Sequence, residues 1–333
     1  MRISNEIKLF SGIQPTGILH IGNYFGTIKN WVKLQKKYDS IFCVVDYHSL
    51  TETIDPKELS KQTLDMAMDL MACGIDPVKS TLFVQSSVPE HTELTWILSS
   101  FTPLAELQRM TQFKEKSQKN IKNINAGLLY YPILMAADIL LYKAEMVPVG
   151  HDQLQHLEIA RTIARKFNKK LGKTFPEPKS LLAPNPRIMS LINPKEKMSK
   201  SGSINSFIAL SDSLATIEKK LASAMTDPAR KRLTDKGTPA KCNLYKLHKL
   251  VSDVSDLRYV EKGCNQAKIG CLECKKLLAK NIFKELEPIQ QRKRKLEKNP
   301  EKIKKILRNG ALRAQKIARE NMKEIKKKIG LFS

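Results

Sequence analysis

Residues that can bind phosphate occur in two short segments of the chain. Residues 11–23 read SGIQPTGILHIGN, and they lie between an apolar run typical of a strand and the start of a helical pattern. His20 and Asn23 can donate hydrogen bonds to phosphate oxygens, Gly22 lets a ligand approach the backbone, and a helix start adds free N–H groups. This segment alone is weak evidence for phosphate binding, because a single His at a helix start is more often a cap or a surface residue.

The second segment is a short lysine-rich loop. Residues 197–201 read KMSKS and precede Gly202, so two lysines and two hydroxyls fall within five residues. Lys carries a compact charge suited to a polyphosphate tail, and a loop beside Gly can act as a mobile clamp. An ordinary solvated lysine loop would look similar, but the occurrence of both segments in one chain favours a nucleotide-phosphate site.

The cysteine spacing suggests a metal site. Four of the six cysteines fall within 33 residues and are spaced C-x21-C-x6-C-x2-C: Cys242, Cys264, Cys271 and Cys274. A C-x2-C pair is a good start for Zn²⁺ or an iron–sulfur cluster, and clustered cysteines in a long cytosolic chain favour metal over disulfides. A [4Fe–4S] cluster, a structural zinc ion and unligated thiols all remain open on this pattern. The other two, Cys43 and Cys73, lie in apolar patterns and are expected in the core.

The charge of the chain is strongly positive and unevenly placed. Lys and Arg number 58 against 33 Asp and Glu, which gives a formal charge of +25. Such a chain is expected to bind polyanions such as nucleic acid, nucleotide phosphates or an acidic membrane surface. Residues 275–333 hold 20 basic and 6 acidic side chains, a net of +14. A lysine run is usually a solvated face, but this concentration favours a contact with nucleic acid.

The elements that must position these residues alternate between strands and helices. The expected strands are residues 7–10, 41–45, 81–84 and 147–149, and the clearest expected helices are residues 59–73 and 151–167. This alternation predicts an α/β fold with a parallel sheet, helices on both faces and ligands at the carboxyl ends of the strands.

Further along the chain the strand signals fade. The Pro-rich residues 175–186 are expected to form a surface connection, and the chain beyond about residue 205 reads as helical. Apolar residues at helical spacing predict a last helix that packs on another part of the protein: Ala311, Ala314, Ala318, Met322, Ile325 and Ile329.

No feature of the sequence points to secretion or to a membrane. The first ten residues have no apolar segment of the secretory kind, and the longest apolar stretch, residues 126–142, is interrupted by Pro132 and Asp138. That stretch is too short to span a bilayer comfortably. We therefore expect no membrane association and a cytoplasmic location.

The two phosphate-binding segments resemble the two signatures of class I aminoacyl-tRNA synthetases. The second matches in full, whereas Asn23 replaces the usual final His of the first. From residue 10 to residue 201 the chain further resembles the bacterial tryptophanyl-tRNA synthetases. The matching strings, in family order, are FSGIQP at 10–15, RMTQFK at 109–114, LMAADILLY at 134–142 and VPVG at 147–150.

The resemblance implies a chemistry and a set of ATP-binding residues. The tryptophan carboxylate attacks the α-phosphorus of ATP and pyrophosphate leaves, with no general base because that carboxylate is ionised at pH 7. Positioning and charge stabilisation would then fall to Lys197, Lys200, His20 and Asn23, with Mg²⁺ held mainly by phosphate oxygens. The implied ATP-binding residues are Gln14, His20, Gly22, Asn23, Gln112, Lys116, Met198, Ser199 and Ser201.

The resemblance also implies a tryptophan pocket. Asp138 would accept the indole N–H, an apolar slot would be lined by Met135, Val147 and Val149, and the α-amino group would be held by Tyr131 and Gln153. Phe10, Gln14 and His48 would border the pocket. A carboxylate inside an apolar run is costly without a partner, which agrees with this role.

Several readings of these residues stay open on the sequence alone. Asp138 could be a helix cap or an ion-pair partner, and it could accept a phenol O–H as well as an indole N–H. A tyrosine-specific relative and a non-catalytic RNA-binding paralogue are the alternative functions. Tyr47, His151 and Leu154 depart from the family pattern at the pocket rim, while His91 and His156 are expected to be structural.

The resemblance extends, more loosely, to the rest of the chain. The four late cysteines resemble the motif of those tryptophanyl-tRNA synthetases that carry a [4Fe–4S] cluster beside the anticodon-binding region, with the first interval one residue shorter here. A homodimer is implied, and tRNA(Trp) is expected to bind through the basic C-terminal region.

The expected domains follow from these assignments. Residues 1–186 would form a Rossmann-like catalytic domain that binds ATP and the amino acid, and residues 187–203 a mobile loop region. Residues 204–298 would form a helical anticodon-binding domain with the four-Cys metal site. Residues 299–333 would form a C-terminal helix that packs back on the catalytic domain.

Overall fold

The computed structural model describes residues 7–51, 55–114, 125–182, 187–200 and 202–332. Its internal contacts divide the chain into two compact units. The first comprises Met1–Thr16, Asn30–Ala183 and Asn299–Ser333, and the second comprises Gly17–Lys29 and Pro184–Lys298. Within the described ranges no helix is long and apolar enough to cross a membrane.

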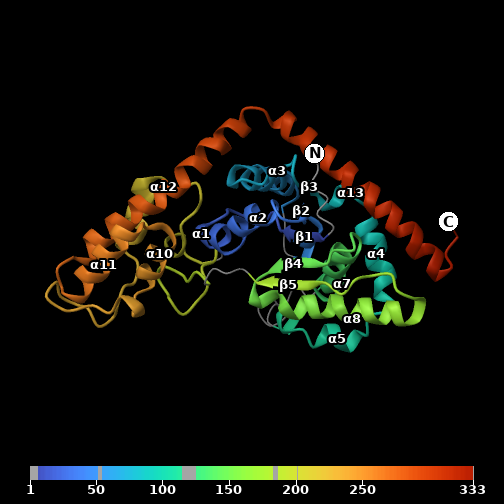
Figure 1. Ribbon diagram of the computed structural model, residues 1–333, viewed down its shortest axis with the longest axis horizontal. Coiled ribbons are helices and arrows are strands. Elements are labelled where there is room, and N and C mark those ends of the chain that lie inside the picture. Colours follow the sequence, from blue (N-terminus) through green and yellow to red (C-terminus); the bar gives the residue numbers. More distant parts are fainter. Residues whose placement is uncertain (1–6, 52–54, 115–124, 183–186, 201, 333) are drawn as a thin grey trace. The chain divides into compact units, whose positions relative to one another are not determined.

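A five-stranded parallel sheet forms the centre of the first unit (Figure 1). Its strands are β1 (Lys8–Ile13), β2 (Asp39–Val44), β3 (Thr81–Val84), β4 (Met146–Val149) and β5 (Lys179–Leu182), in the spatial order β3-β2-β1-β4-β5. The chain order reverses between β1 and β4, so the carboxyl ends of these two strands flank the place where parallel α/β sheets bind ligands. This Rossmann-like architecture is the one expected, and the four predicted strands are found.

The fifth strand corrects the expectation for residues 175–186. That stretch was expected to be a surface connection, but Lys179–Leu182 pair with β4, with Met146 opposite Lys179. None of its four residues is fully buried, because β5 lies at the edge of the sheet. An edge strand needs no continuous apolar run, and this is why the sequence pattern did not reveal it.

Helices cover the sheet and connect its strands. They are α2 (Lys29–Leu34), α3 (Pro56–Cys73), α4 (Glu90–Ser99), α5 (Leu104–Gln108), α7 (Ala126–Leu140), α8 (Leu154–Leu171) and α13 (Pro300–Ile329). The predicted helix at residues 59–73 is confirmed as α3, which begins at the capping side chain of Asp55 and ends at Gly74 with φ of 113°. Single turns follow β2 and β3 at Tyr47–Thr51 and Gln85–Ser87, and Ile163 and Phe167 of α8 enter the core.

The last helix, α13, packs against the edge strand β3 and also contacts α3 and α4. Its apolar stripe is buried from Ala311 to Ile325. The approach is close at Gly310, where an added Cβ would overlap the carbonyl oxygen of Leu82. A helix laid on β3 in this way covers an edge that would otherwise be open to strand pairing.

The second unit is mainly helical, as expected for the C-terminal region. Its main helices are α9 (Leu214–Ala222), α10 (Asn243–Val251), α11 (Val254–Asn265) and α12 (Cys271–Glu297). Residues 17–29, which include the short helix α1 (Ile21–Asn23), group with this unit because Ile21 N–H donates to Ile208 O and Leu210 N–H to Leu19 O, both at 2.9 Å. The domain boundaries expected from the sequence stay a prediction.

Candidate active site

Polar residues follow the carboxyl ends of neighbouring strands in the first unit. Gln14 comes directly after β1, His48 lies in the turn after β2, and Gln85 is the first residue after β3. Gly150 follows β4. Since the carboxyl ends of parallel strands meet at one edge of a sheet, these residues are brought toward the same ligand-binding edge.

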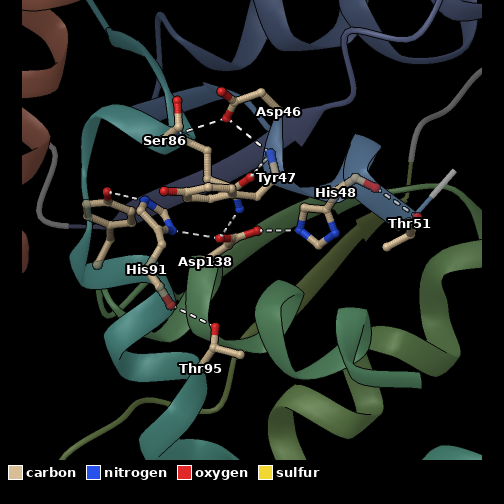
Figure 2. A network of polar contacts seen from close by, with 10 residues as sticks. Asp46, Tyr47, His48, Thr51, Ser86, His91, Thr95 and Asp138 are labelled. Atoms are coloured by element: carbon tan, nitrogen blue, oxygen red, sulfur yellow. Dashed lines mark hydrogen bonds and ion pairs between the residues drawn. The ribbon is translucent and has the colours of Figure 1, made fainter. Parts of the chain in front are cut away.

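Asp138, near the end of α7, is the buried centre of this edge. It is 2% exposed. His48 Nε2 lies 2.9 Å from Asp138 Oδ2, while His91 Nδ1 and Gln85 Nε2 lie 2.6 Å and 2.7 Å from Oδ1 (Figure 2). The carboxylate is therefore held by three side chains from three different elements.

The hydrogen bonds decide the charge of Asp138. Burial alone would raise the pKa of this carboxyl, but hydrogen bonds from His48 and His91 outweigh burial and lower the pKa to about 2. At neutral pH Asp138 is thus an ionised acceptor in an apolar environment. Among the described residues Oδ1 has two donors and Oδ2 has one, so Oδ2 retains capacity for a further N–H donor.

The apolar residues assigned to the pocket belong to one core cluster. Phe10 and Val147 are each 3% exposed, and Met135 and Val149 are partly buried against the same cluster. The ring of Phe10 stacks on that of Tyr142 at a centroid distance of 5.6 Å. The structure thus brings Phe10, Met135, Val147 and Val149 together with Asp138 in one unit.

The residues assigned to the α-amino group are placed less tightly. The hydroxyl of Tyr131 lies 2.7 Å from His156 Nε2 and 3.3 Å from Gln112 Oε1, and its ring is 6.4 Å from that of His48. Gln153 is partly buried before α8, and its amide donates to Asp152 at 3.4 Å. Lys116, Ser201 and the side chain of His151 fall outside the described residues.

In the second unit, His20 and Asn23 cap the short helix α1. His20 Nδ1 accepts the Gly22 N–H at 3.0 Å, and Asn23 Oδ1 accepts the His20 N–H at 3.1 Å. The alternative that His20 is a helix cap is therefore confirmed. It does not exclude phosphate binding, because a neutral ring that accepts at Nδ1 keeps its proton on Nε2.

The lysine segment lies beside this cap in the same unit. Burial, and then the charges of Lys197 and Lys200, lower the pKa of His20 to about 4. A Cβ on Gly17, whose φ is +70°, would come within 2.8 Å of the Lys200 side chain. Met198 is 2% exposed and its N–H donates to Ile188 O, which anchors the segment between the two lysines. The structure thus brings the two signature segments together, with Ser199 exposed between the lysines.

Three of the four late cysteines pack against one small apolar cluster. Cys242, Cys264 and Cys274 pack against Tyr245, Val260 and Ile269. Burial, and then the neighbouring thiols, raise the pKa of Cys274 to about 12. Within the described part of the chain, however, no three His, Cys, Asp or Glu side chains are arranged to hold a metal ion.

Three members of the Asp138 network were not assigned from the sequence. Gln85 and Tyr142 were not singled out, and His91 was expected to be only structural. The position of Gln85 directly after a buried strand could have indicated it, as it did for the other residues at this edge. Nothing in its spacing marks His91, because it reaches Asp138 through the packing of α4 on α7, and Tyr142 is linked to the carboxylate through His91.

Comparisons with known proteins agree with the resemblance of the motifs. A family model described as class I tRNA synthetases (W and Y) matches residues 2–287. The tryptophan–tRNA ligase of Deinococcus radiodurans is 48% identical over 98% of this chain and 99% of its own, and that of Helicobacter pylori strain 26695 is 44% identical over 98% and 99%. The crystal structure of tryptophanyl-tRNA synthetase from Campylobacter jejuni complexed with ADP and tryptophan has a TM-score of 0.88 and 37% identity, and it covers 98% of this chain and 100% of its own.

Proposed function

The chain belongs to the bacterial tryptophanyl-tRNA synthetases, an enzyme family of class I, and we propose that Asp138 recognises the indole while the two signature segments bind ATP. The enzyme joins tryptophan to tRNA. Relatives at 44% and 48% identity over nearly the full chain are tryptophan–tRNA ligases, so the tyrosine-specific and non-catalytic readings are set aside.

The proposal for the amino-acid pocket rests on the ionised carboxylate of Asp138, whose Oδ2 can accept a further hydrogen bond. Indole N–H is a donor only, so an apolar slot needs one buried acceptor. Within the described residues Oδ2 of Asp138 accepts only from His48, and the adjacent Ala137 and Ile139 belong to the apolar core cluster that contains Val147. Tryptophan would bind there with Met135, Val147 and Val149 along the ring. Tyr131 and Gln153 would serve the α-amino group.

The first chemical step needs no proton transfer. The tryptophan carboxylate oxygen bonds to the α-phosphorus, the bond from that phosphorus to the bridging oxygen breaks, and pyrophosphate leaves with the electron pair. Tryptophanyl-adenylate remains, and a tRNA hydroxyl then attacks its carbonyl carbon and releases AMP. Bound Mg²⁺ would supply positive charge to the phosphates, chiefly through their own oxygens.

The chain's own contribution to this step is charge and positioning. Lys197 and Lys200 would neutralise the α-phosphate and the departing pyrophosphate, and His20 would donate from Nε2. Further ATP contacts would come from Gln14, Gly22, Asn23, Gln112, Lys116, Met198, Ser199 and Ser201. In support, besides burial, the charges of Lys197 and Lys200 contribute to the lowered pKa of His20, as expected for three groups that lie near one another.

We extend the proposal to a metal at the four cysteines. Cys242, Cys264, Cys271 and Cys274 would hold a [4Fe–4S] cluster, or alternatively a zinc ion, that braces the helical unit. Three of them share one apolar cluster, and Cys271 lies one helical turn before Cys274 on α12. Such a donor set fits either metal group.

The metal proposal is tested by elemental analysis of anaerobically purified protein. Four irons and four sulfides per chain would support the cluster, and one zinc per chain without sulfide would support the alternative. A Cys43→Ser variant is the matched control, since that buried thiol lies in the other unit and should leave the metal content unchanged. Folded protein without iron or zinc would refute both.

The remaining partners are proposed from charge and family. tRNA(Trp) would bind through the basic C-terminal region, and the enzyme would act in the cytoplasm as a homodimer. The net charge of +14 over residues 275–333 supports the tRNA contact.

The function is tested by charging of tRNA with labelled tryptophan. The wild type should charge tRNA, and Asp138→Asn should lower kcat/KM for tryptophan by about ten- to a hundred-fold because a charged acceptor is removed. Asp39→Asn, at an exposed carboxylate on the same sheet, should leave the rate unchanged. Full activity of Asp138→Asn would overturn the assignment of the pocket.

A further inference from the structure

His91 is a fully buried titratable residue to which no role has been assigned. It is 0% exposed, and both of its ring nitrogens have partners. Nδ1 lies 2.6 Å from Asp138 Oδ1, and Nε2 lies 2.8 Å from the hydroxyl of Tyr142 (Figure 2 shows the contact with Asp138). The ring is packed between aromatic neighbours, with centroids of Phe83 and Tyr142 at 5.8 Å and 5.4 Å.

The chemistry of the partners fixes the direction of these hydrogen bonds. Asp138 is ionised and can only accept, so His91 donates from Nδ1. Burial raises the pKa of Tyr142 well above its usual range, so its hydroxyl keeps its proton. For the neutral tautomer that has its proton on Nδ1, that hydroxyl donates to Nε2, and donation runs from Tyr142 through His91 to Asp138.

These contacts act on Oδ1, the carboxylate oxygen of Asp138 that has two donors among the described residues. Within the part of the chain that the structure describes, His91 and Gln85 both donate to Oδ1, which fills that oxygen, whereas Oδ2 accepts only from His48. Rotation of a carboxylate about its last torsion is broad unless its oxygens are held. Two fixed donors on Oδ1 hold the plane of the group and so set the direction in which Oδ2 presents its remaining lone pair.

We propose that His91, oriented by Tyr142, is a positioning residue for tryptophan recognition: it holds Asp138 Oδ1 so that Oδ2 is aimed at the indole N–H. The proposal rests on the assignment of Asp138 as the indole acceptor. His91 itself touches neither substrate nor ATP in this account. Its effect should therefore be confined to the interaction of Oδ2 with the indole N–H.

A substrate pair isolates that interaction. The first substrate is tryptophan, and the second is 3-(3-benzothienyl)alanine, in which sulfur replaces the indole N–H with little change of shape. The ratio of their kcat/KM values in ATP–pyrophosphate exchange reports the hydrogen bond to Oδ2. In the wild type this ratio should be about ten- to a hundred-fold in favour of tryptophan, as for a hydrogen bond to a charged group.

The proposal predicts how two variants change this ratio. His91→Leu removes the donor to Oδ1 and should lower the ratio at least several-fold, with the KM for ATP unchanged. His91→Asn keeps an N–H near the position of Nδ1 and should restore most of the ratio. Thr95→Val, one turn along α4, breaks only a hydrogen bond to the His91 carbonyl and should leave the ratio as in the wild type.

Each outcome has a distinct meaning. A wild-type ratio near one would overturn the assignment of Asp138, and the proposal with it. A normal wild-type ratio that persists in His91→Leu would overturn the role of His91 alone, because a purely structural residue would slow both substrates equally. If His91→Leu does not fold, Tyr142→Phe decides: it keeps the ring and removes only the hydroxyl, so it should lower the ratio, and an unchanged ratio refutes the proposal.

Discussion

At the scale of single residues, the proposed function depends on two titratable groups, Asp138 and His20, whose charge states the fold sets in different ways. Burial of the Asp138 carboxylate is unfavourable, and hydrogen bonds from His48, Gln85 and His91 offset its loss of solvation. His20 is kept neutral by burial and by neighbouring lysines, so it is a donor and not a cation at pH 7. Each site has its charge state set before a ligand arrives.

Lys200 is predicted to act on the reaction rate and not on tryptophan binding. Lys200→Ala removes a positive charge that would stabilise the departing pyrophosphate, and it should lower kcat in ATP–pyrophosphate exchange by about 10²- to 10³-fold. The KM for tryptophan should not change. Lys195→Ala, an exposed lysine two residues before the segment, is the control and should behave as the wild type. An unchanged kcat in Lys200→Ala would remove its proposed role.

His20 is predicted to make the protein less stable in acid. Its pKa is about 4 in the folded state and 6.5 in the unfolded chain, so between these pH values only the unfolded chain takes up the proton. The free energy of unfolding should therefore fall by about 2 kcal/mol from pH 7 to pH 5 through this group. Urea unfolding of wild type and His20→Asn at both pH values measures the difference. Equal decreases in the two proteins would contradict the prediction.

At the scale of elements, the sequence predicted the strands and helices that bury apolar residues. It missed the edge strand β5, which is defined by backbone pairing. The apolar run at residues 41–45 gave β2, and the stripe from Ala311 to Ile325 gave a last helix with one buried face. β5 could not be predicted, because its residues are only partly buried. The last helix was expected to pack back on the catalytic domain, but its apolar stripe alone did not specify β3 as the element that it covers.

The same limit explains the candidate site. Asp138 stood out because a carboxylate interrupts an apolar run, and Phe10 and Val147 were assigned through family strings. Gln85 and His91 were not assigned, since their role arises only when β3 and α4 pack beside α7. Sequence motifs predict the groups that bind ligands. The residues that position those groups become visible only in the tertiary structure.

Gly310 is predicted to fix α13 to the sheet. Ala at a helical position is usually about 1 kcal/mol more favourable than Gly. Here its Cβ would overlap the Leu82 carbonyl, so Gly310→Ala should instead cost about 1–3 kcal/mol as overpacking does. Asn309→Ala, exposed on the same helix, should be neutral or stabilising. Urea unfolding compares the two, and a stabilised Gly310→Ala would show that α13 does not pack closely on β3.

At the scale of the whole molecule, charge is the property that bears on tRNA. More than half of the net charge of +25 lies in residues 275–333, on α12 and α13. Binding of a polyanion by the cations of either helix would release counterions and weaken with salt.

The tRNA interaction is predicted to depend on exposed cations of α13. Replacing Lys302, Lys305 and Arg308 by Gln should weaken tRNA binding and lower the slope of log Kd against log salt by up to about 0.9 for each phosphate that is no longer neutralised. The same change at Lys36, Lys37 and Lys61, three exposed lysines outside the basic C-terminal region, is the control. Filter binding of tRNA over a salt series measures both, and equal slopes would place the tRNA-binding surface elsewhere.

The most direct test of the central claim is ATP–pyrophosphate exchange by the purified protein with tryptophan, with tyrosine and with no amino acid. We expect exchange that depends on tryptophan alone, because relatives at 44% and 48% identity over nearly the full chain are tryptophan–tRNA ligases. Exchange that depends on tyrosine, or no exchange from folded protein with its metal content intact, would contradict it.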